Sequence, residues 1–432
     1  MRKFVIVLVV SLLYASLAVT SGFASNCTLK IFGNANMDGT IDEGDIEYVQ
    51  GIIEGTNDET ELADANYDGQ IDEEDIAQIE LIIGGEEEQL TLIDMADRVV
   101  TIEMPVERVV LADLLDGIDT LVQLGAEDKI VGIVEGIKTQ GYGQLIDQQP
   151  SSWWTPLQEA APDLKDLPTV GTIDNLNLEE IVSLKPDVIF AYGARGLDAA
   201  NTIQEKTEIP TICLTNNGGS NWAKLDDDGL WSYRLIGWVV GKEDEAEELI
   251  SYIDDRIGEI TEITSEIPDS EKPRVYMAGW TTYLTMTPLN YDPIDLAGGM
   301  NVAKEAGETF FTVEVSKEQI LAWNPEIIVI HRVPTSKSHV WGNSIDKILS
   351  DPDLQSIDAV KNNRIYYTKG FCYGWDPATG IVETLYLAKL FHPDKFEDLD
   401  VEAAGNDILE HFYGAEGLYT EMSERCEFYK WE

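Results

Sequence analysis

The apolar positions from residue 90 onward alternate between short continuous runs and longer stretches with helical spacing. Runs at residues 109–111, 130–133, 188–191 and 211–214 are typical of buried strands. Helical patterns separate these runs along the chain. This alternation predicts an α/β fold built on mostly parallel sheets.

One helix-and-strand unit occurs twice, 139 positions apart. Residues 178–190 show an amphipathic helix, a proline, an acidic residue and an apolar strand, and residues 317–329 repeat that order. Proline cannot continue a helix, so each helix has to end before it. Arg108 and Arg274 also open corresponding strands. The simplest interpretation is a pair of similar α/β lobes.

Between the two halves, an apolar helical pattern runs from about residue 229 to 264 without a strand. We expect one long rigid helix that joins an N-lobe of about residues 95–228 to a C-lobe of about residues 270–415. A cleft between two lobes is a common ligand site. Residues 416–432 are expected to form a C-terminal tail.

Two acidic segments near the N-terminus repeat at an interval of 30 residues. Each has oxygen-bearing side chains at positions 1, 3, 5, 9 and 12 and a glycine at position 6, where the chain must turn sharply. Calcium prefers six to eight hard oxygen ligands, so this spacing predicts two Ca²⁺ ions. Positions 40 and 70 contribute backbone carbonyls. The predicted ligands are Asn34, Asn36, Asp38, Thr40, Asp42 and Asp45 in the first loop, and Asp64, Asn66, Asp68, Gln70, Asp72 and Asp75 in the second.

An apolar helical pattern follows each loop, and residues 28–86 resemble the dockerin module of cellulosomal proteins. The resemblance lies in the paired loops, the Asp at position 12 and the lack of a helix before the first loop. It implies a cohesin-like partner, although positions 10 and 11, through which dockerins recognise cohesins, hold Glu43 and Gly44 in the first loop and Glu73 and Glu74 in the second, a mostly acidic set. A calcium-stapled spacer without such a partner is the alternative. Residues 87–94 are expected to be a solvated linker.

The charge balance is strongly acidic, with 80 Asp and Glu against 29 Lys and Arg, a net charge of −51. Nucleic acid is excluded as a partner because binding it requires a basic face. Residues 1–24 have the charged start, apolar stretch and small residues of an export signal, with a retained membrane anchor as the alternative. We expect an exported, extracytoplasmic protein associated with the cell surface. Its contact with the membrane is expected only through the signal, a lipid on Cys27 or a permease.

Ligands of parallel sheets bind beyond the carboxyl ends of the strands. Aromatic side chains there offer faces to a flat chelate, and arginines offer paired donors to a carboxylate or phosphate. Packing, surface ion pairs and structural hydrogen bonding are the alternative roles. The candidate ligand-binding residues are Tyr192, Arg195, Trp280, Tyr283, His331, Arg332, Trp341, Tyr373 and Trp375. Cys213 is expected to be a buried thiol, and Cys372 and Cys426 are candidates for a disulfide.

Residues from about 95 to 415 resemble the iron-siderophore and cobalamin type of periplasmic binding protein. Segments 124–132, 177–189, 298–302, 359–366 and 392–396 carry the resemblance through their order and spacing. It implies two lobes on a rigid helix, which capture a ferric siderophore, haem or corrinoid for an ABC permease. It also implies docking on the permease through one acidic residue in each lobe, and the internal repeat makes Glu179 and Glu318 equivalent.

Catalytic motifs are lacking: the sequence contains no phosphate-binding loop, nucleophile elbow or zinc-protease helix, and only four histidines. We therefore expect a binding protein and not an enzyme. Two alternatives are a dockerin-bearing extracellular enzyme that degrades polysaccharide and a surface scaffold protein without a transport role. The sequence does not identify the chelate.

Overall fold

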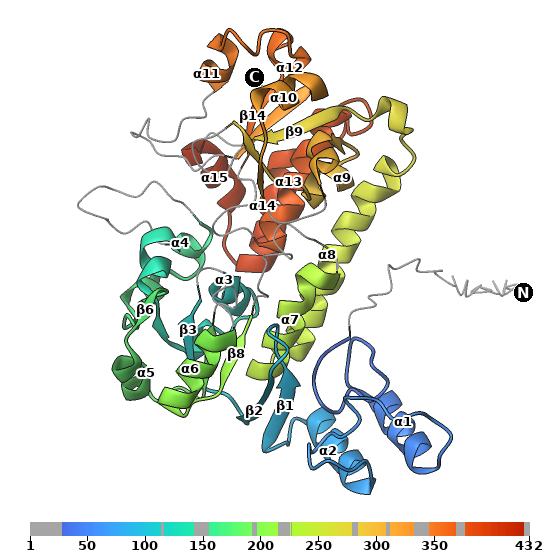
Figure 1. Cartoon of the computed structure of the whole chain (residues 1–432), viewed down its shortest axis with the longest axis vertical. Coiled ribbons are helices and arrows are strands. Elements are labelled where there is room, and N and C mark those ends of the chain that lie inside the picture. The colour runs from blue at the N-terminus through green and yellow to red at the C-terminus, as the bar shows by residue number, and fades with distance from the viewer. Residues whose placement is uncertain are drawn as a thin grey trace, which may run out of the picture.

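The computed structural model contains two α/β lobes, with a small helical module beside one of them (Figure 1). It describes residues 28–113, 116–141, 155–191, 197–214, 225, 227–278, 284–307, 312–331, 345–368 and 376–426. The export signal predicted at residues 1–24 and the lipid site predicted at Cys27 lie outside these residues. Among the helices described, none is both long and apolar enough to cross a bilayer.

The N-lobe is built on a four-stranded parallel sheet in the order β4-β3-β7-β8. The strands are β3 (Val109–Ala112), β4 (Ile130–Ile133), β7 (Val188–Ala191) and β8 (Thr211–Cys213), which confirms the four strands predicted. A two-stranded antiparallel sheet pairs β5 (Gly171–Thr172) with β6 (Asn175–Leu176). The helices of this lobe are α3 (Asp116–Gln123), α4 (Leu157–Ala160), α5 (Leu178–Leu184) and α6 (Leu197–Thr207), with short helical turns at Glu127–Lys129, Ile137–Gly141 and Pro162–Asp166.

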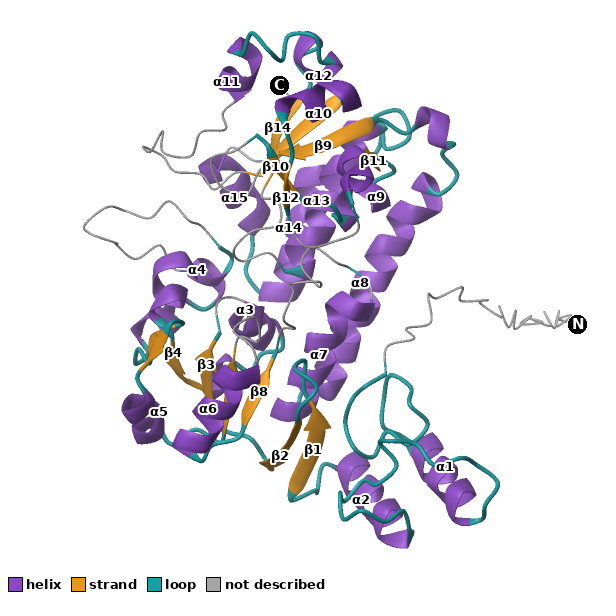
Figure 2. Ribbon diagram, in the orientation of Figure 1, coloured by secondary structure: helices purple, strands orange, loops and turns teal. Residues whose placement is uncertain are grey.

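The C-lobe repeats this plan with a second parallel sheet in the order β11-β9-β13-β14. Its strands are β9 (Arg274–Ala278), β11 (Met300–Asn301), β13 (Ile327–His331) and β14 (Ile365–Thr368). The stretches after Pro186 and Pro325 lie in different sheets, as two separate lobes require (Figure 2). The other elements are the antiparallel pair β10 (Met286–Thr287) and β12 (Val313–Glu314), helices α9 (Asp292–Leu296), α10 (Lys317–Trp323), α11 (Ile345–Ser350) and α12 (Asp358–Lys361), and 3₁₀ turns at Asp269–Glu271 and Val302–Ala306.

The internal repeat is also visible in hydrogen bonds. The Arg108 guanidinium donates to the carbonyl of Leu184 at the end of α5, and Arg274 donates to Trp323 at the end of α10. Each arginine also gives its backbone N–H to the acid after the repeated proline, at 2.8 Å in the N-lobe and 2.9 Å in the C-lobe. The same pattern of residues therefore builds the same corner in both lobes.

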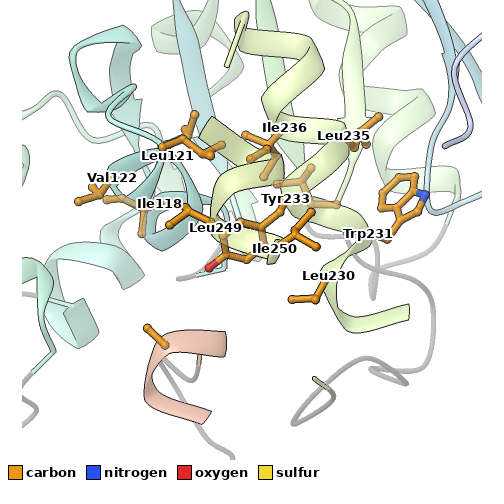
Figure 3. Close-up of a cluster of buried hydrophobic side chains, with 14 of the residues drawn as sticks. Ile118, Leu121, Val122, Leu230, Trp231, Tyr233, Leu235, Ile236, Leu249 and Ile250 are labelled. Carbon is orange, nitrogen blue, oxygen red and sulfur yellow. The ribbon is translucent and has the colours of Figure 1, made fainter. Parts of the chain in front are cut away.

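The connection between the lobes corrects the prediction of a single helix over residues 229–264. It consists of α7 (Asp227–Val240) and α8 (Glu243–Thr264), which pack against each other. Gly241 ends α7 with a φ of +69°, a left-handed conformation that glycine adopts without strain. Of these two helices, α8 is the one that runs from the N-lobe to the C-lobe, with a length of about 33 Å at 1.5 Å per residue. Figure 3 shows Leu121 and Val122 of α3 among the apolar side chains packed near α7 and α8.

The helical part of the chain continues beyond residue 415, where the C-lobe was expected to end. Helices α13 (Pro377–Phe391) and α14 (Val401–Tyr413) pack against each other, α13 also contacts α8, and α14 contacts α3 of the N-lobe. Residues 416–432 were expected to form a tail, but they include α15 (Leu418–Cys426), which packs on α14. Leu418 and Met422 are buried because that helix has an apolar face.

The N-terminal module contains helices α1 (Glu43–Ile53) and α2 (Glu73–Gly84), each of which begins at position 10 of a predicted calcium loop. This confirms the helix predicted after each loop. The expectation of a solvated linker at residues 87–94 is wrong, because β1 (Gln89–Ile93) pairs with β2 (Val99–Glu103) and Leu90 and Leu92 are buried. Glu87 is also buried, at 8% exposure. Leu90 and Leu92 alternate with other residues along β1, so they point to one face of the strand and that face is buried.

The module is joined to the N-lobe by backbone pairing on both sides of β1. Ile31 bridges Leu92, while Phe32 N–H donates to Thr91 at 2.9 Å and Ile93 N–H to Lys30 at 2.8 Å. The buried apolar residues of the module and the N-lobe form one continuous cluster. The module therefore packs against the N-lobe through paired backbone and a shared core, and is not attached only by a linker.

A buried ion pair fixes the same β1–β2 hairpin to the edge of the N-lobe sheet. Arg98 contacts Asp94 at 2.7 Å, and the Asp94 side chain is fully buried. Asp94 also accepts a hydrogen bond from the backbone N–H of Cys213 in β8, at 3.0 Å, and Arg98 also donates to the carbonyl of Thr211. Cys213 is buried, and burial raises the pKa of its thiol to about 12, so the prediction of an inert core thiol is confirmed.

Candidate ligand-binding and calcium sites

Most of the predicted ligand residues lie outside the part of the chain that the structure describes. His331 alone lies among the described residues. The other eight, outside them, are Tyr192, Arg195, Trp280, Tyr283, Arg332, Trp341, Tyr373 and Trp375. Cys372 also lies outside, so its pairing with Cys426 stays a prediction.

His331 is the last residue of β13, and its register partner across the sheet is Thr368, the last residue of β14. Register partners on parallel strands point to the same face. His331 is 6% exposed and Thr368 is completely buried. The Thr368 hydroxyl has no hydrogen-bond partner in the described part of the chain, where such a buried group costs about 1–3 kcal/mol. Thr368 is not among the predicted ligand residues because only the pairing of β13 with β14 places it beside His331.

Helix α13 covers the face to which these two side chains point. Tyr366 lies two residues before Thr368 and on the same face of the strand. Burial is the main cause that raises the pKa of Tyr386 in α13, and the nearby Tyr366 raises it further. Ile327 and Val329, which share this face with His331, belong to the same core cluster as Ile381 of α13. The part of this sheet that carries Tyr366 therefore lies near α13.

A buried polar group joins the two lobes close to the start of α13. Asp376, the N-cap of α13, accepts a bond from Gln123 of α3 at 3.1 Å, and Gln123 accepts one from the Tyr233 hydroxyl of α7. Tyr413 of α14 donates to Asp119 of α3 at 3.2 Å. Burial, and then the charges of Asp376 and Asp119, hold the pKa of Tyr233 well above its usual value. These phenols therefore remain protonated donors.

The two predicted docking residues occupy matching places in the two lobes. Glu179 and Glu318 are each the second residue of a seven-residue helix, and both side chains are exposed. The helices begin at side-chain N-caps, Asn177 and Ser316, and end in a left-handed residue before the repeated proline. An exposed acid in the first turn of a helix is also stabilised by the helix dipole, which is a structural reason for its presence.

The two predicted calcium loops have the same internal bonding. In each, the position-5 N–H donates to the side chains at positions 1 and 3, and the position-5 carboxylate accepts from the position-7 N–H. The position-12 carboxylate accepts from the N–H groups at positions 3 and 9. Side-chain oxygens therefore line the inside of both turns in the same order.

The position-12 acids are the buried members of these loops. Asp45 is 0% and Asp75 is 1% exposed. Burial, reinforced by Asp38 and Asp42, raises the pKa of Asp45 to about 6, and burial also raises the pKa of Asp75. A buried carboxylate beside other carboxylates is the environment that a bound cation stabilises.

Carboxylates alone do not complete either loop as a metal site. Counting only His, Cys, Asp and Glu, no group of three in the described ranges is arranged to hold a metal ion. The amide oxygens of Asn34, Asn36 and Asn66 and the carbonyls of Thr40 and Gln70 would have to contribute. That donor set of neutral and charged oxygens fits calcium in chemistry.

Comparison with known proteins identifies relatives of the two-lobed part. A model of the periplasmic binding protein family matches residues 114–370. The molybdate-binding protein MolA of Haemophilus influenzae is 26% identical over 354 residues, covering 74% of this chain and 90% of the relative. The Fe(3+)-citrate-binding protein YfmC of Bacillus subtilis is 28% identical over 204 residues, 46% of this chain and 59% of the relative. The solved structure of MolA bound to molybdate matches with a TM-score of 0.59 at 23% identity, over 76% of this chain and 98% of that one.

Proposed function

Because the chain belongs to the periplasmic binding protein family, whose members are the solute-binding proteins of ABC importers, we propose that its own cargo is a metal chelate. A ferric siderophore or ferric carboxylate, haem or a corrinoid would bind between the lobes and pass to an ABC permease. The chain would act outside the cytoplasm after export. The relative MolA is a molybdate-binding protein, which supports a binding role and not a catalytic one for this chain.

The observation that carries this proposal is the duplicated lobe on a spanning helix. Two parallel sheets with matching corners are connected by α8. This helix has 22 residues and is therefore about 33 Å long. Strand ends of parallel sheets are ligand-binding edges. The Fe(3+)-citrate-binding relative supports a chelate as cargo, whereas MolA points to a bare oxyanion as the second candidate.

Isothermal titration calorimetry of the mature chain with ferric citrate, haem, cyanocobalamin and sodium molybdate tests this proposal. We expect one-to-one binding of one of the first three. Binding of molybdate alone would replace the chelate with an oxyanion, and binding of none would contradict a transport role for these solutes.

A second proposed function belongs to the N-terminal module, which we propose binds two Ca²⁺ ions through the twelve residues named above. The supporting observations are the shared bonding of the two loops and the buried acids Asp45 and Asp75. The ions would neutralise those carboxylates and stabilise the turns. Its dockerin resemblance further suggests a cohesin-like partner, which a pull-down with a purified cohesin domain would test.

The docking residues complete the proposal. Glu179 and Glu318 would meet arginines on the permease, one from each lobe. Their exposure and their equivalence in the repeat support this role.

A further inference from the structure

Thr368 carries a buried hydroxyl with no hydrogen-bond partner among the described residues, and it lies at the carboxyl edge of the C-lobe sheet, where parallel sheets commonly bind ligands. Its side chain is 0% exposed, and no described residue accepts from it or donates to it. Native folds rarely bury a hydroxyl in this way, since the group loses water and gains nothing in return. A bound ligand would supply the partner that the described part of the chain does not provide.

The sister lobe shows that the fold itself does not require a hydroxyl at this place. Ile189 pairs with Thr211 in the N-lobe as Ile328 pairs with Ile365 in the C-lobe. Counting forward along the last strand of each sheet, Leu214 corresponds to Thr368. Leu214 is 3% exposed, so an apolar side chain fills the equivalent buried position.

His331 supplies a second polar side chain beside Thr368. The two are register partners at the ends of neighbouring strands, which lie about 4.8 Å apart. A threonine hydroxyl and an imidazole N–H can both donate hydrogen bonds. Two donors at this spacing on one face suit the oxygen atoms of a single anionic group.

We propose that Thr368 and His331 form a donor pair for a negatively charged oxygen of the cargo. The oxygen would belong either to a bare oxyanion or to a carboxylate of a metal chelate. This proposal rests on the proposed function and narrows it to oxygen-rich anionic cargo. In this proposal Thr368 donates a hydrogen bond to the cargo and does not serve only to pack the core.

The test compares Thr368→Val and Thr368→Ser in the full mature chain, titrated with sodium molybdate, ferric citrate and cyanocobalamin. Valine removes the hydroxyl at nearly the same volume, and serine keeps it. We expect T368V to weaken binding of the anionic probe that the unaltered chain takes by roughly tenfold, and T368S to stay within about threefold. Without a probe, the melting temperature of T368V should be unchanged or higher, because an unpartnered polar group has been removed.

Thr264→Val is the matched control. Thr264 is also buried, at 4% exposure, but its hydroxyl donates to the Leu296 carbonyl at 2.8 Å. T264V should therefore lower the melting temperature and leave the affinity unchanged, the reverse of T368V.

The possible outcomes distinguish failure of the donor pair from failure of the proposed solute-binding function. A loss confined to molybdate identifies an oxyanion as the group bound, and a loss with ferric citrate identifies a chelate carboxylate. Equal affinity of T368V and the unaltered chain, or binding of neutral cyanocobalamin alone, overturns the donor pair and leaves the solute-binding function standing. Binding of no probe by the unaltered chain overturns both.

Discussion

Gln123 of α3 donates a hydrogen bond from its side-chain amide to the carboxylate of Asp376, the N-cap of α13, over 3.1 Å. The two residues are 253 positions apart, and they connect the N-lobe to the helix that follows the second-lobe segment 369–375. Both are buried. This bond ties the C-terminal helices to the N-lobe, so the lobes share more than the spacer helix.

Replacing Gln123 by Leu should destabilise the protein by about 2–3 kcal/mol. The substitution leaves the Tyr233 hydroxyl and the Asp376 carboxylate without their shared partner in a buried place. Urea denaturation followed by circular dichroism measures the loss. Gln50→Leu is the control, since Gln50 is exposed and its side chain donates to Glu54, the C-cap of the same helix; equal midpoints for the two variants would contradict the importance of the buried link.

Glu87→Gln should stabilise the protein at pH 7 by on the order of 1 kcal/mol. One oxygen of the buried Glu87 carboxylate has no hydrogen-bond partner among the described residues, and burial raises its pKa. Glu87 in turn contributes to raising the pKa of Glu243, after burial, at the start of α8. A carboxyl with a raised pKa favours the fold when protonated, so this part of the stability is lost as pH rises.

The gain from Glu87→Gln should therefore shrink as the pH is lowered through the carboxyl range. Melting curves at a series of pH values measure it. Glu88→Gln, at an exposed neighbouring position, should show no such gain. A gain that grows toward acid would mean that the sign of the Glu87 contribution is wrong.

Calcium should raise the melting temperature of the whole chain and not only of the module. The reason is the continuous core and the backbone pairing of Ile31 with Leu92, which couple the loops to the N-lobe. Differential scanning calorimetry with calcium and then with a chelator measures the shift. Asp45→Asn should remove most of it, while Asp58→Asn, an exposed residue outside both loops, should not. A separate low transition for the module, with the rest unchanged, would show that the junction does not couple them.

Charge reversal at Glu179 or Glu318 should reduce uptake several-fold and leave solute affinity unchanged. Each side chain is exposed and away from the strand ends, so neither the fold nor the cargo depends on it. Transport into vesicles carrying the permease provides the measurement. Glu262→Lys on the exposed side of α8 is the matched control. Normal uptake by both docking variants would refute the assignment.

The sequence predicted those parts of the fold in which local patterns and the global arrangement agree. The proline-acid corners at Pro186 and Pro325 identified the repeat, and the repeat predicted two sheets. The break at Gly241 was missed because one glycine in a long apolar pattern is also compatible with a continuous helix. The strand at Gln89–Ile93 was missed because its partners, Val99–Glu103 and Ile31, become visible only in the pairing.

The candidate ligand site shows a similar division. The position at the end of an apolar strand pattern was enough to select His331, whereas Thr368 depended on the register between β13 and β14. Gln123 and Asp376 could not be connected from sequence, since nothing local relates residues in different lobes. The calcium loops could be predicted from the sequence because all the expected ligands of each loop lie within twelve consecutive positions.

Native mass spectrometry of the mature chain, after incubation with metal-loaded spent medium from cells that produce it, tests the central claim most directly. We predict one small metal-containing molecule per chain, with an isotope pattern that identifies the metal. A bound oligosaccharide, or a chain that retains no small molecule in this medium, would contradict the account.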